Sequence, residues 1–318
     1  MKLIDLLNHP AVFFVLALLS ALFAGNVMLK RARFGQAIRE DGPQAHLKKS
    51  GTPTMGGVIF IVGFLIPIML SLAFEIYSVS VAIAAVLIFG FIGFMDDYLK
   101  VVRHHNLGLR AYQKILLQLI GAIVLTVMSA QLGTGFYIPF IGRVVDFGWF
   151  FYPVTIFVIL ALDNAVNLTD GLDGLCASVT LVISVFFAIT GLVVGNMGVM
   201  LTSVAMMGAL IGYLKFNWYP AKVFMGDTGS LALGGYVVAM FILLKIQLLV
   251  PIVGIIYFAE ALSVIIQVGV FKRTGKRFFK MAPLHHHFEL SGWKETKIVW
   301  LFSAITLVSS IVGLYLIF

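Results

Sequence analysis

The chain has 318 residues, of which 61% are hydrophobic and only 11% are charged, and its mean hydropathy is +1.05. Soluble domains carry about 45–50% apolar and about 25% charged residues, so this composition excludes an ordinary soluble globule and indicates a polytopic membrane protein. A single cysteine, Cys176, excludes an internal disulfide and a thiolate metal site. The formal net charge of +8 fits basic loops that face anionic lipid and anionic substrates, so we expect no nucleic-acid partner.

Ten apolar runs have the length that a bilayer requires, and they predict one all-α integral-membrane domain over residues 1–318. The linkers after the odd-numbered runs hold nineteen of the 22 Lys and Arg residues, so we expect those linkers in the cytoplasm and both termini outside. In an outer linker, residues 136–147 predict a small β-hairpin that turns at Ile141 and Gly142. The expected spans are residues 11–29, 55–74, 79–95, 113–130, 151–167, 175–194, 199–214, 229–244, 250–270 and 297–317.

A polar stretch at residues 163–174 lies between two apolar runs and holds three carboxylates and two side-chain amides. Charged groups at the edge of a membrane segment are costly and are usually functional. The alternative is a polar loop between two helices, but a loop does not require Asn164, Asn167 and Asp170 at three-residue intervals. We therefore interpret this stretch as the centre of a functional site.

Two adjacent carboxylates, Asp96 and Asp97, end another apolar run, and Lys100 follows within one helical turn. A surface ion pair is the alternative interpretation, and such pairs contribute little. However, two neighbouring carboxylates repel each other, and one lysine compensates only one of them. Because the chain offers carboxylates and amides rather than thiols, a divalent cation with oxygen ligands, Mg²⁺, is the expected cofactor.

Residues 224–230 precede a further apolar run, and the backbone amides and hydroxyls there suit a phosphate oxygen. Asp227 is the candidate metal ligand of this segment, or alternatively the cap of the helix that follows. The consecutive His285, His286 and His287 cannot all converge on one tetrahedral zinc ion. They are instead candidate donors to a pyrophosphate or a sugar, with a pH-sensitive surface loop as the alternative.

These unusual polar clusters all fall on the predicted cytoplasmic side, where Lys48, Lys49, Lys100 and Lys114 add positive charge. Cations and carboxylate-held Mg²⁺ are the parts expected for phosphoryl transfer. The residues alone therefore predict a Mg²⁺-dependent, phosphoryl-type transfer to a membrane lipid. They do not place Glu260, which lies within the ninth run; there we expect a structural partner in a bent helix.

Five motifs, at residues 51–57, 96–100, 164–174, 224–230 and 283–289, resemble those of the phospho-N-acetylmuramoyl-pentapeptide transferases. The aspartate motifs fit the wider superfamily of polyprenyl-phosphate sugar-1-phosphate transferases, whereas the histidine block and residues 51–57 are more specific to this branch. The resemblance implies that undecaprenyl phosphate attacks UDP-N-acetylmuramoyl-pentapeptide, releasing UMP and giving lipid I of peptidoglycan synthesis. It also implies a multi-pass protein of the bacterial plasma membrane with a cytoplasmic active site.

By this resemblance Asp227 holds Mg²⁺, with Asp96, Asp97 and Asn167 as further candidate ligands. Asp96 and Asp97 are expected to handle the lipid phosphate or its proton. The candidate catalytic residues are Asp96, Asp97, Lys100, Asp227 and His286. The candidate substrate-binding residues are Lys49, Lys114, Asn167, Asp170, Gly171, Asp173, Asn217, Phe224, Gln267, His285 and His287.

Several alternatives stay open at this stage. Two mechanisms are possible: the lipid phosphate attacks the donor directly, or an Asp carboxylate is first covalently phosphorylated. We favour direct attack because the lipid phosphate is already largely ionised at neutral pH. A transferase for UDP-N-acetylglucosamine has the same chemistry, but the histidine block argues against it. An ion-coupled transporter would place its carboxylates near the bilayer midplane, often within inverted repeats. Both a monomer and a homodimer are compatible with the sequence.

Overall fold

The computed structural model describes residues 9–31, 51–71, 73, 76–101 and 108–318. Among these residues, nine helices are long and apolar enough to cross a membrane, and a tenth apolar helix is shorter. The prediction of an all-α polytopic membrane protein is therefore confirmed. The long helices are α2 (Pro10–Arg31), α5 (Tyr77–Val101), α6 (Ala111–Ala130), α7 (Phe151–Thr169), α8 (Leu175–Val193), α9 (Met197–Asn217), α10 (Gly226–Leu243), α12 (Ile255–Thr274) and α14 (Glu295–Ile317).

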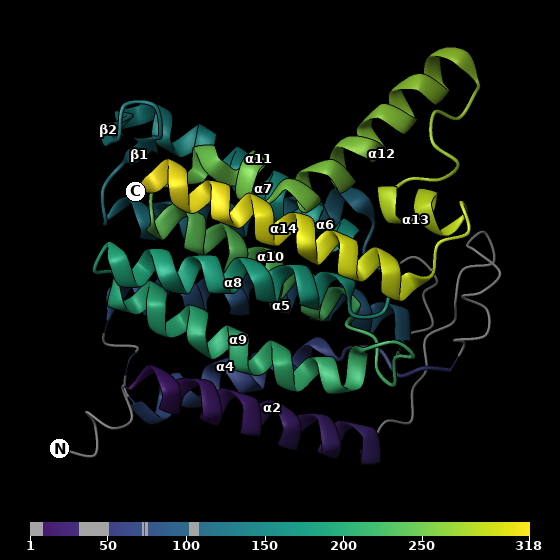
Figure 1. Cartoon of the computed structure of the whole chain (residues 1–318), viewed down its shortest axis with the longest axis horizontal. Helices are drawn as coiled ribbons and strands as arrows, with labels where there is room; N and C mark the ends of the chain where they lie inside the picture. The colour runs from purple at the N-terminus through teal and green to yellow at the C-terminus, as the bar shows by residue number, and fades with distance from the viewer. Residues whose placement is uncertain (1–8, 32–50, 72, 74–75, 102–107) are drawn as a thin grey trace.

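Two expected spans differ from the structure. The second, expected over residues 55–74, is the 15-residue helix α4 (Gly57–Ser71). The ninth, expected over residues 250–270, is divided at Gly254 into the single turn α11 (Val250–Val253) and the long helix α12. Glycine lowers helix stability, and hydropathy does not register such a break. As a result, α12 projects obliquely away from the other helices (Figure 1).

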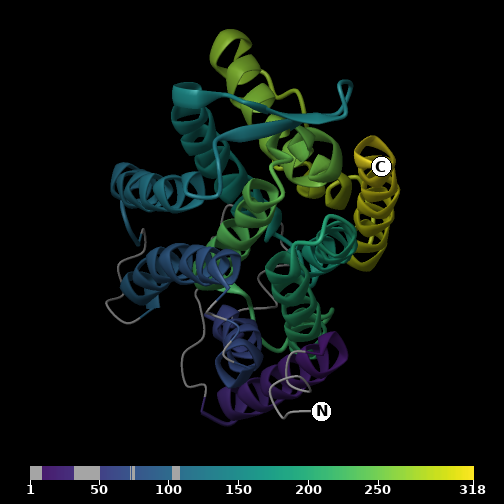
Figure 2. The same cartoon turned by 90° about the vertical axis from the view of Figure 1, so that its left-hand side faces the viewer.

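Helix α10 runs through the middle of the bundle, with other helices around it (Figure 2). Every residue of α10 from Thr228 to Leu243 is buried. Small residues allow this, as is usual where membrane helices approach closely. A Cβ atom on Gly234 would lie 2.2 Å from Oδ1 of Asp163, and one on Gly235 would lie 2.6 Å from the Ala85 carbonyl oxygen. The position of α10 is thereby fixed against α5 and α7.

One end of the bundle carries the predicted hairpin. Strands β1 (Gly135–Ile138) and β2 (Arg143–Asp146) pair antiparallel, with Gly135 opposite Asp146. The short 3₁₀ turns η2 (Gly148–Phe150) and η3 (Gln247–Leu249) lie at the same end, since η2 follows β2 directly and η3 contacts β1. The Tyr137 hydroxyl group donates to the Ile317 carbonyl at 3.1 Å, so the end of α14 is tied to the hairpin.

The opposite end of the bundle gathers the polar residues. There α5 and α7 end, α6 and α10 begin, and the six-residue helix α13 (Leu284–Glu289) packs nearby (Figure 1). Segments that are far apart in the sequence therefore bring their polar termini together. The convergence of polar clusters on one face, predicted from the loops, is confirmed for the described residues.

Candidate active site

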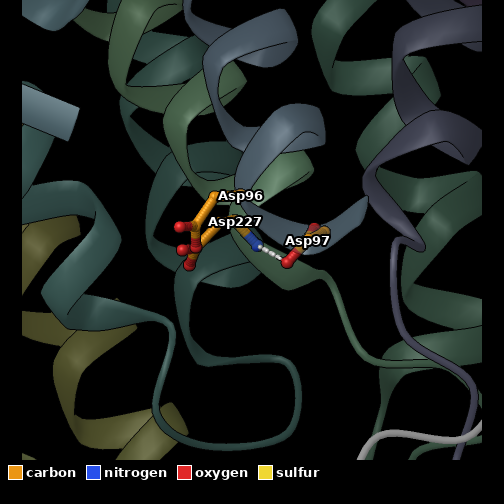
Figure 3. Close-up of side chains that lie close together, drawn as sticks. All are labelled: Asp96, Asp97 and Asp227. Atoms are coloured by element: carbon orange, nitrogen blue, oxygen red, sulfur yellow. Dashed lines mark hydrogen bonds between the residues drawn. The ribbon is translucent and has the colours of Figure 1, made fainter. Parts of the chain in front are cut away.

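Three carboxylates from two helices form the centre of the site (Figure 3). Asp96 and Asp97 come from the last turns of α5, and Asp227 comes from the first turn of α10. Each offers one oxygen atom, and these three atoms lie within 4.8 Å of one another. The close approach depends on Gly93, because a Cβ atom there would lie 1.9 Å from the Asp227 carbonyl oxygen. The α5–α10 crossing thus sets the carboxylate geometry.

Asp97 caps the first turn of α10. Its Oδ1 accepts from the Asp227 N–H at 3.1 Å, and its Oδ2 accepts from the N–H and the hydroxyl group of Thr228, at 2.8 and 2.6 Å. The sequence had offered these backbone amides to a phosphate, or Asp227 as the cap of its own helix. In the structure the Asp97 carboxylate, from α5, accepts these amide N–H groups and also serves as the cap of α10. The amides at a helix N-terminus need such an anionic or polar acceptor.

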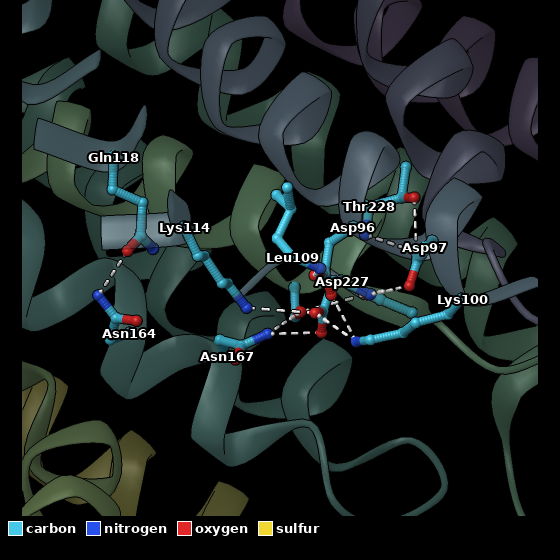
Figure 4. A network of polar contacts seen from close by, with 12 residues as sticks. Asp96, Asp97, Lys100, Leu109, Lys114, Gln118, Asn164, Asn167, Asp227 and Thr228 are labelled. Carbon is cyan, nitrogen blue, oxygen red and sulfur yellow. Dashed lines mark hydrogen bonds and ion pairs between the residues drawn. The ribbon is translucent and has the colours of Figure 1, made fainter. Parts of the chain in front are cut away.

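Two lysines converge on the same oxygen of Asp227 (Figure 4). The Nζ atoms of Lys100 and Lys114 lie 2.9 and 3.1 Å from Asp227 Oδ2, and Lys100 also pairs with Asp96. Lys114, expected to bind substrate, is therefore engaged with the carboxylate cluster. Asn167 donates to the other Asp227 oxygen at 3.0 Å. When all three carboxyl groups are ionised, they exceed the two ammonium groups by one negative charge.

The donor set fits a hard divalent cation. The three carboxylates provide only oxygen atoms, which Mg²⁺ and Ca²⁺ prefer. Two ammonium groups already meet at Asp227 Oδ2, so this oxygen lies where positive charge is favoured. The side chains of Asp96 and Asp97 are almost fully buried, whereas that of Asp227 is 20% exposed. Asp227 is thus the most accessible of the three.

A loop between α7 and α8 forms the neighbouring wall. The Gly174 N–H donates to Asn217 Oδ1 at 3.0 Å, and the Ala221 N–H donates to Asp173 Oδ2 at 2.9 Å. Burial raises the pKa of the Asp170 carboxyl group well above its usual range, and the carboxylates of Asp227, Asp97 and Asp173 raise it further. The predicted residues Asp170, Asp173 and Asn217 therefore lie in connected segments beside the carboxylate cluster.

The first histidine of α13 reaches this loop. A Cβ atom on Gly171 would lie 2.0 Å from His285 Nε2, so only a residue without a side chain leaves room for the ring. His286 Nδ1 lies 3.1 Å from Glu289 Oε2, and the His287 Nδ1 accepts from the Lys280 N–H at 3.2 Å. The three histidines thus point to different partners, in agreement with the exclusion of a three-histidine zinc site.

Other predicted substrate-binding residues have structural contacts. Gln267 Oε1 accepts from the backbone N–H groups of Phe278 and Phe279, at 3.1 and 2.9 Å. The Phe224 N–H donates to the Pro53 carbonyl at 2.7 Å, which aligns residues 53–56 beside the start of α10. Lys49 lies outside the described residues. The roles of these residues in binding a nucleotide stay predictions.

Sequence reasoning missed a polar pair one turn deeper in the bundle. Gln118 on α6 donates to Asp163 Oδ2 at 2.7 Å and accepts from Asn164 at 3.2 Å. Both Gln118 and Asp163 are fully buried. The sequence did hold a signal for this pair. Gln118 lies four residues after Lys114, and Asp163 lies four residues before Asn167, so in each helix the deeper residue shares a face with one that contacts Asp227. The pair therefore forms a second polar layer beneath the lysine and amide that contact Asp227.

The fold and the site place the chain in the class of membrane-embedded glycosyl transferases. The model of glycosyl transferase family 4 matches residues 79–245, which include the carboxylates, Lys100, Lys114 and the loop between α7 and α8. The phospho-N-acetylmuramoyl-pentapeptide-transferase signature 1 matches residues 49–61.

Curated relatives narrow this class further. The chain is 50% identical over 289 residues to the phospho-N-acetylmuramoyl-pentapeptide-transferase of Clostridium novyi, covering 90% of this chain and 89% of the relative. For the enzyme of that name from Clostridioides difficile the identity is 50% over 295 residues, covering 92% and 91%. For that from Carboxydothermus hydrogenoformans it is 49% over 308 residues, covering 93% and 94%. The chain belongs to the phospho-N-acetylmuramoyl-pentapeptide-transferase family, and the resemblance predicted from the motifs is confirmed.

Proposed function

We propose that this protein transfers phospho-N-acetylmuramoyl-pentapeptide from its UDP donor to undecaprenyl phosphate, giving lipid I and UMP in peptidoglycan synthesis. A lipid phosphate oxygen forms a bond to the sugar-linked phosphorus, and the bond from that phosphorus to the oxygen of UMP breaks. The observation that carries this proposal is the carboxylate and lysine cluster at the end of the bundle, in a chain about half identical to enzymes of this name.

We propose Mg²⁺ as the cofactor. Asp227, the most accessible of the three carboxylates, would hold it, with Asp96 beside it and Asn167 holding the second Asp227 oxygen. When bound, the ion would neutralise the charge that develops on the transferred phosphoryl group and on the UMP leaving group. Asp97 remains a candidate ligand, but its two oxygens already accept three hydrogen bonds from the start of α10.

The remaining residues then divide the work of binding and positioning. Lys100 and Lys114 neutralise the carboxylates before substrate binds and offer positive charge to the phosphates. Asp96 is the candidate to take a proton from the lipid phosphate, and its Oδ1 also accepts from the Leu109 N–H at 2.7 Å. Direct attack by the lipid phosphate is the favoured route because that phosphate is already largely ionised at neutral pH.

The uridine end of the donor is proposed to bind between the loop around Asp173 and the segment at Phe224. These two segments are joined through Asn217, which accepts from Gly174 and donates to the Val223 carbonyl at 2.9 Å. The half-buried ring of Phe224 is a suitable stacking surface for uracil. His285, His286 and His287 would lie toward the diphosphate and sugar.

We place the active site on the cytoplasmic face of the bacterial plasma membrane. Basic residues follow the odd-numbered spans, and the described ends of the helices that precede those linkers lie at the same end of the bundle as the carboxylate cluster. The opposite end, with the hairpin and the end of α14, would face outward. A homodimer stays a prediction.

The decisive experiment measures UMP release by the purified protein in detergent, with a polyprenyl phosphate as the acceptor. Assays with and without Mg²⁺ are compared, with UDP-N-acetylmuramoyl-pentapeptide and UDP-N-acetylglucosamine as alternative donors. We expect Mg²⁺-dependent release from the muramoyl donor alone. Release from the other donor would reject the assigned donor, and no release in either detergent or lipid would reject the proposed function.

A further inference from the structure

Glu260 is a fully buried carboxylate in the membrane helix α12, and its side chain reaches α13. Its Oε1 accepts from the backbone N–H of His285 at 3.2 Å, and the same oxygen lies 3.2 Å from His285 Nδ1. Within the described residues, both polar partners of this carboxylate thus belong to one residue. The expectation of a structural partner for Glu260 is met, and the partner is the first histidine of the triple block.

A second side chain of α12 holds the same returning segment. Gln267 lies seven residues after Glu260, which is two helical turns, so both side chains project from one face of α12. Gln267 accepts from the N–H groups of Phe278 and Phe279 and donates to the Phe279 carbonyl at 3.3 Å. Helix α12 therefore makes hydrogen bonds to the segment before α13 through Gln267 and to α13 itself through Glu260.

The ring of His285, held by Glu260, packs against Gly171 in the loop of the candidate active site. Its Nε2 is buried and faces the Cα of Gly171, where an added Cβ atom would lie only 2.0 Å away. The His285 and His286 rings are 4.2 Å apart, so the orientation of one ring limits that of the other. A shift of His285 would therefore move both the neighbouring histidine and the wall formed by the loop between α7 and α8.

Packing alone does not require a carboxylate at this depth. Burying an ionisable side chain in a membrane helix costs free energy, and a well-packed apolar side chain would serve a purely structural contact as well or better. An apolar side chain cannot accept a hydrogen bond from the His285 N–H or interact electrostatically with its Nδ1. The partial charge and the geometry of the contact are thus what Glu260 contributes.

We propose that Glu260 is a positioning residue that sets the place of His285, and through it of His286 and the Gly171 loop, relative to the carboxylate cluster. This inference deepens the proposed function and rests on it for its kinetic test. Glu260 itself touches no reacting group in this arrangement; it acts through α13.

Hydrogen exchange tests the contact without any assumption about activity. Exchange is followed by mass spectrometry over residues 278–290 in the wild-type protein, Glu260→Ala and Glu260→Gln. We expect exchange at the His285 amide to accelerate at least tenfold in Glu260→Ala and to stay near wild type in Glu260→Gln, whose side-chain oxygen can accept the same N–H. Ser263→Ala is the matched control, since Ser263 is buried one turn away but its hydroxyl group donates to the Glu260 carbonyl of its own helix. Unchanged exchange in Glu260→Ala would overturn the proposal.

A double-mutant cycle tests the consequence for catalysis. We expect Glu260→Ala to lower kcat for UMP release at least tenfold with little change in KM for the lipid phosphate. The double variant Glu260→Ala, His285→Ala should be no slower than the slower single variant, whereas Ser263→Ala should keep the wild-type rate. If the fold-reduction in kcat of the double variant equals the product of the two single reductions, the two residues act separately and the proposal is overturned.

If Glu260→Ala does not fold, the same cycle is made with Glu260→Gln and Glu260→Asp against His285→Ala. There the expected outcome is near-wild-type activity for Gln and a loss for Asp, because the shorter side chain no longer reaches the His285 N–H. An equal loss in both would contradict the assigned contact. A wild-type protein that releases no UMP would reject the proposed function, and the exchange experiment would still decide the contact itself.

Discussion

Asp97 on α5 and Thr228 on α10 are joined by two hydrogen bonds to one carboxylate oxygen, from the Thr228 N–H at 2.8 Å and from its hydroxyl group at 2.6 Å. Adjacent aspartates in the sequence therefore have different surroundings. Asp97 fixes the start of α10, whereas Asp96 contacts Lys100 and the Leu109 N–H. The contacts of Asp97 thus hold two helices together, whereas those of Asp96 connect it to a lysine and to the segment before α6.

The first prediction concerns this joint. Thr228→Val keeps the side-chain shape and removes the hydroxyl group, so we expect the folded state to lose about 1.5–3 kcal/mol, as for a hydrogen bond to a charged group. Thermal unfolding in detergent measures the loss. Thr155→Val is the control, because the Thr155 hydroxyl group is buried without a hydrogen-bond partner in the described structure. An equal effect of both substitutions would refute the assigned role of the Asp97 contact.

The second prediction separates metal binding from substrate binding at Lys114. Lys114→Met removes one positive charge from beside Asp227, and even in water a charge at this distance is worth about 1 kcal/mol, which sets about fivefold in affinity as the lower bound. We expect the Mg²⁺ concentration for half-maximal UMP release to fall by at least about that factor, while KM for the UDP donor rises. Lys222→Met, an exposed lysine at the same end of the bundle, should change neither value. A higher Mg²⁺ requirement in Lys114→Met would contradict this assignment.

The third prediction tests the α5–α10 crossing. Gly93→Ala would place a Cβ atom 1.9 Å from the Asp227 carbonyl oxygen, so the helices must separate and we expect a loss of at least about 1–3 kcal/mol with most of the activity. Gly269→Ala in α12 meets nothing within 4 Å and should instead be neutral or stabilising by about 0.5–1 kcal/mol. Unfolding temperature and UMP release are measured on both variants. Full activity in Gly93→Ala would show that the crossing does not set the site.

The fourth prediction concerns pH. Because the pKa of Asp170 is raised in the folded protein, first by burial and then by neighbouring carboxylates, its ionisation opposes folding. Below the unfolded value of about 4 this cost is absent, and it grows as pH rises toward the folded pKa. We therefore expect Asp170→Asn to gain stability relative to the wild type as pH rises, in unfolding temperatures measured from pH 4.5 to 8.5.

Asp146 in the hairpin is the matched control of opposite sign. Hydrogen bonds from the Thr134 hydroxyl group and the Gly148 N–H lower the pKa of Asp146, so its contribution is present at neutral pH and is lost as pH falls. Asp146→Asn should thus lose stability relative to the wild type at neutral pH and converge with it in acid. A stability difference between wild type and Asp170→Asn that stays constant with pH would reject the raised pKa.

Much of the architecture follows from local composition. Hydropathy alone predicted eight of the ten spans closely, and a turn at Ile141 and Gly142 predicted the hairpin, because both depend on neighbouring residues only. The break at Gly254 was not predicted, since an apolar run does not reveal where a helix is interrupted. Motif composition also located Asp96, Asp97 and Asp227, because several carboxylates at membrane helix ends are rare and costly.

The sequence by itself thus determined the class of protein, most of the membrane spans and the candidate set of site residues. Only the tertiary structure decided which partner each side chain has. In the structure Asp97 contacts the start of α10, Lys114 pairs with Asp227, Gln118 donates to Asp163, and Glu260 accepts from His285. The physical reason is that a hydrogen bond operates over about 3 Å, whereas these partners lie between 25 and 131 residues apart along the chain, so only the packing of the helices brings them together.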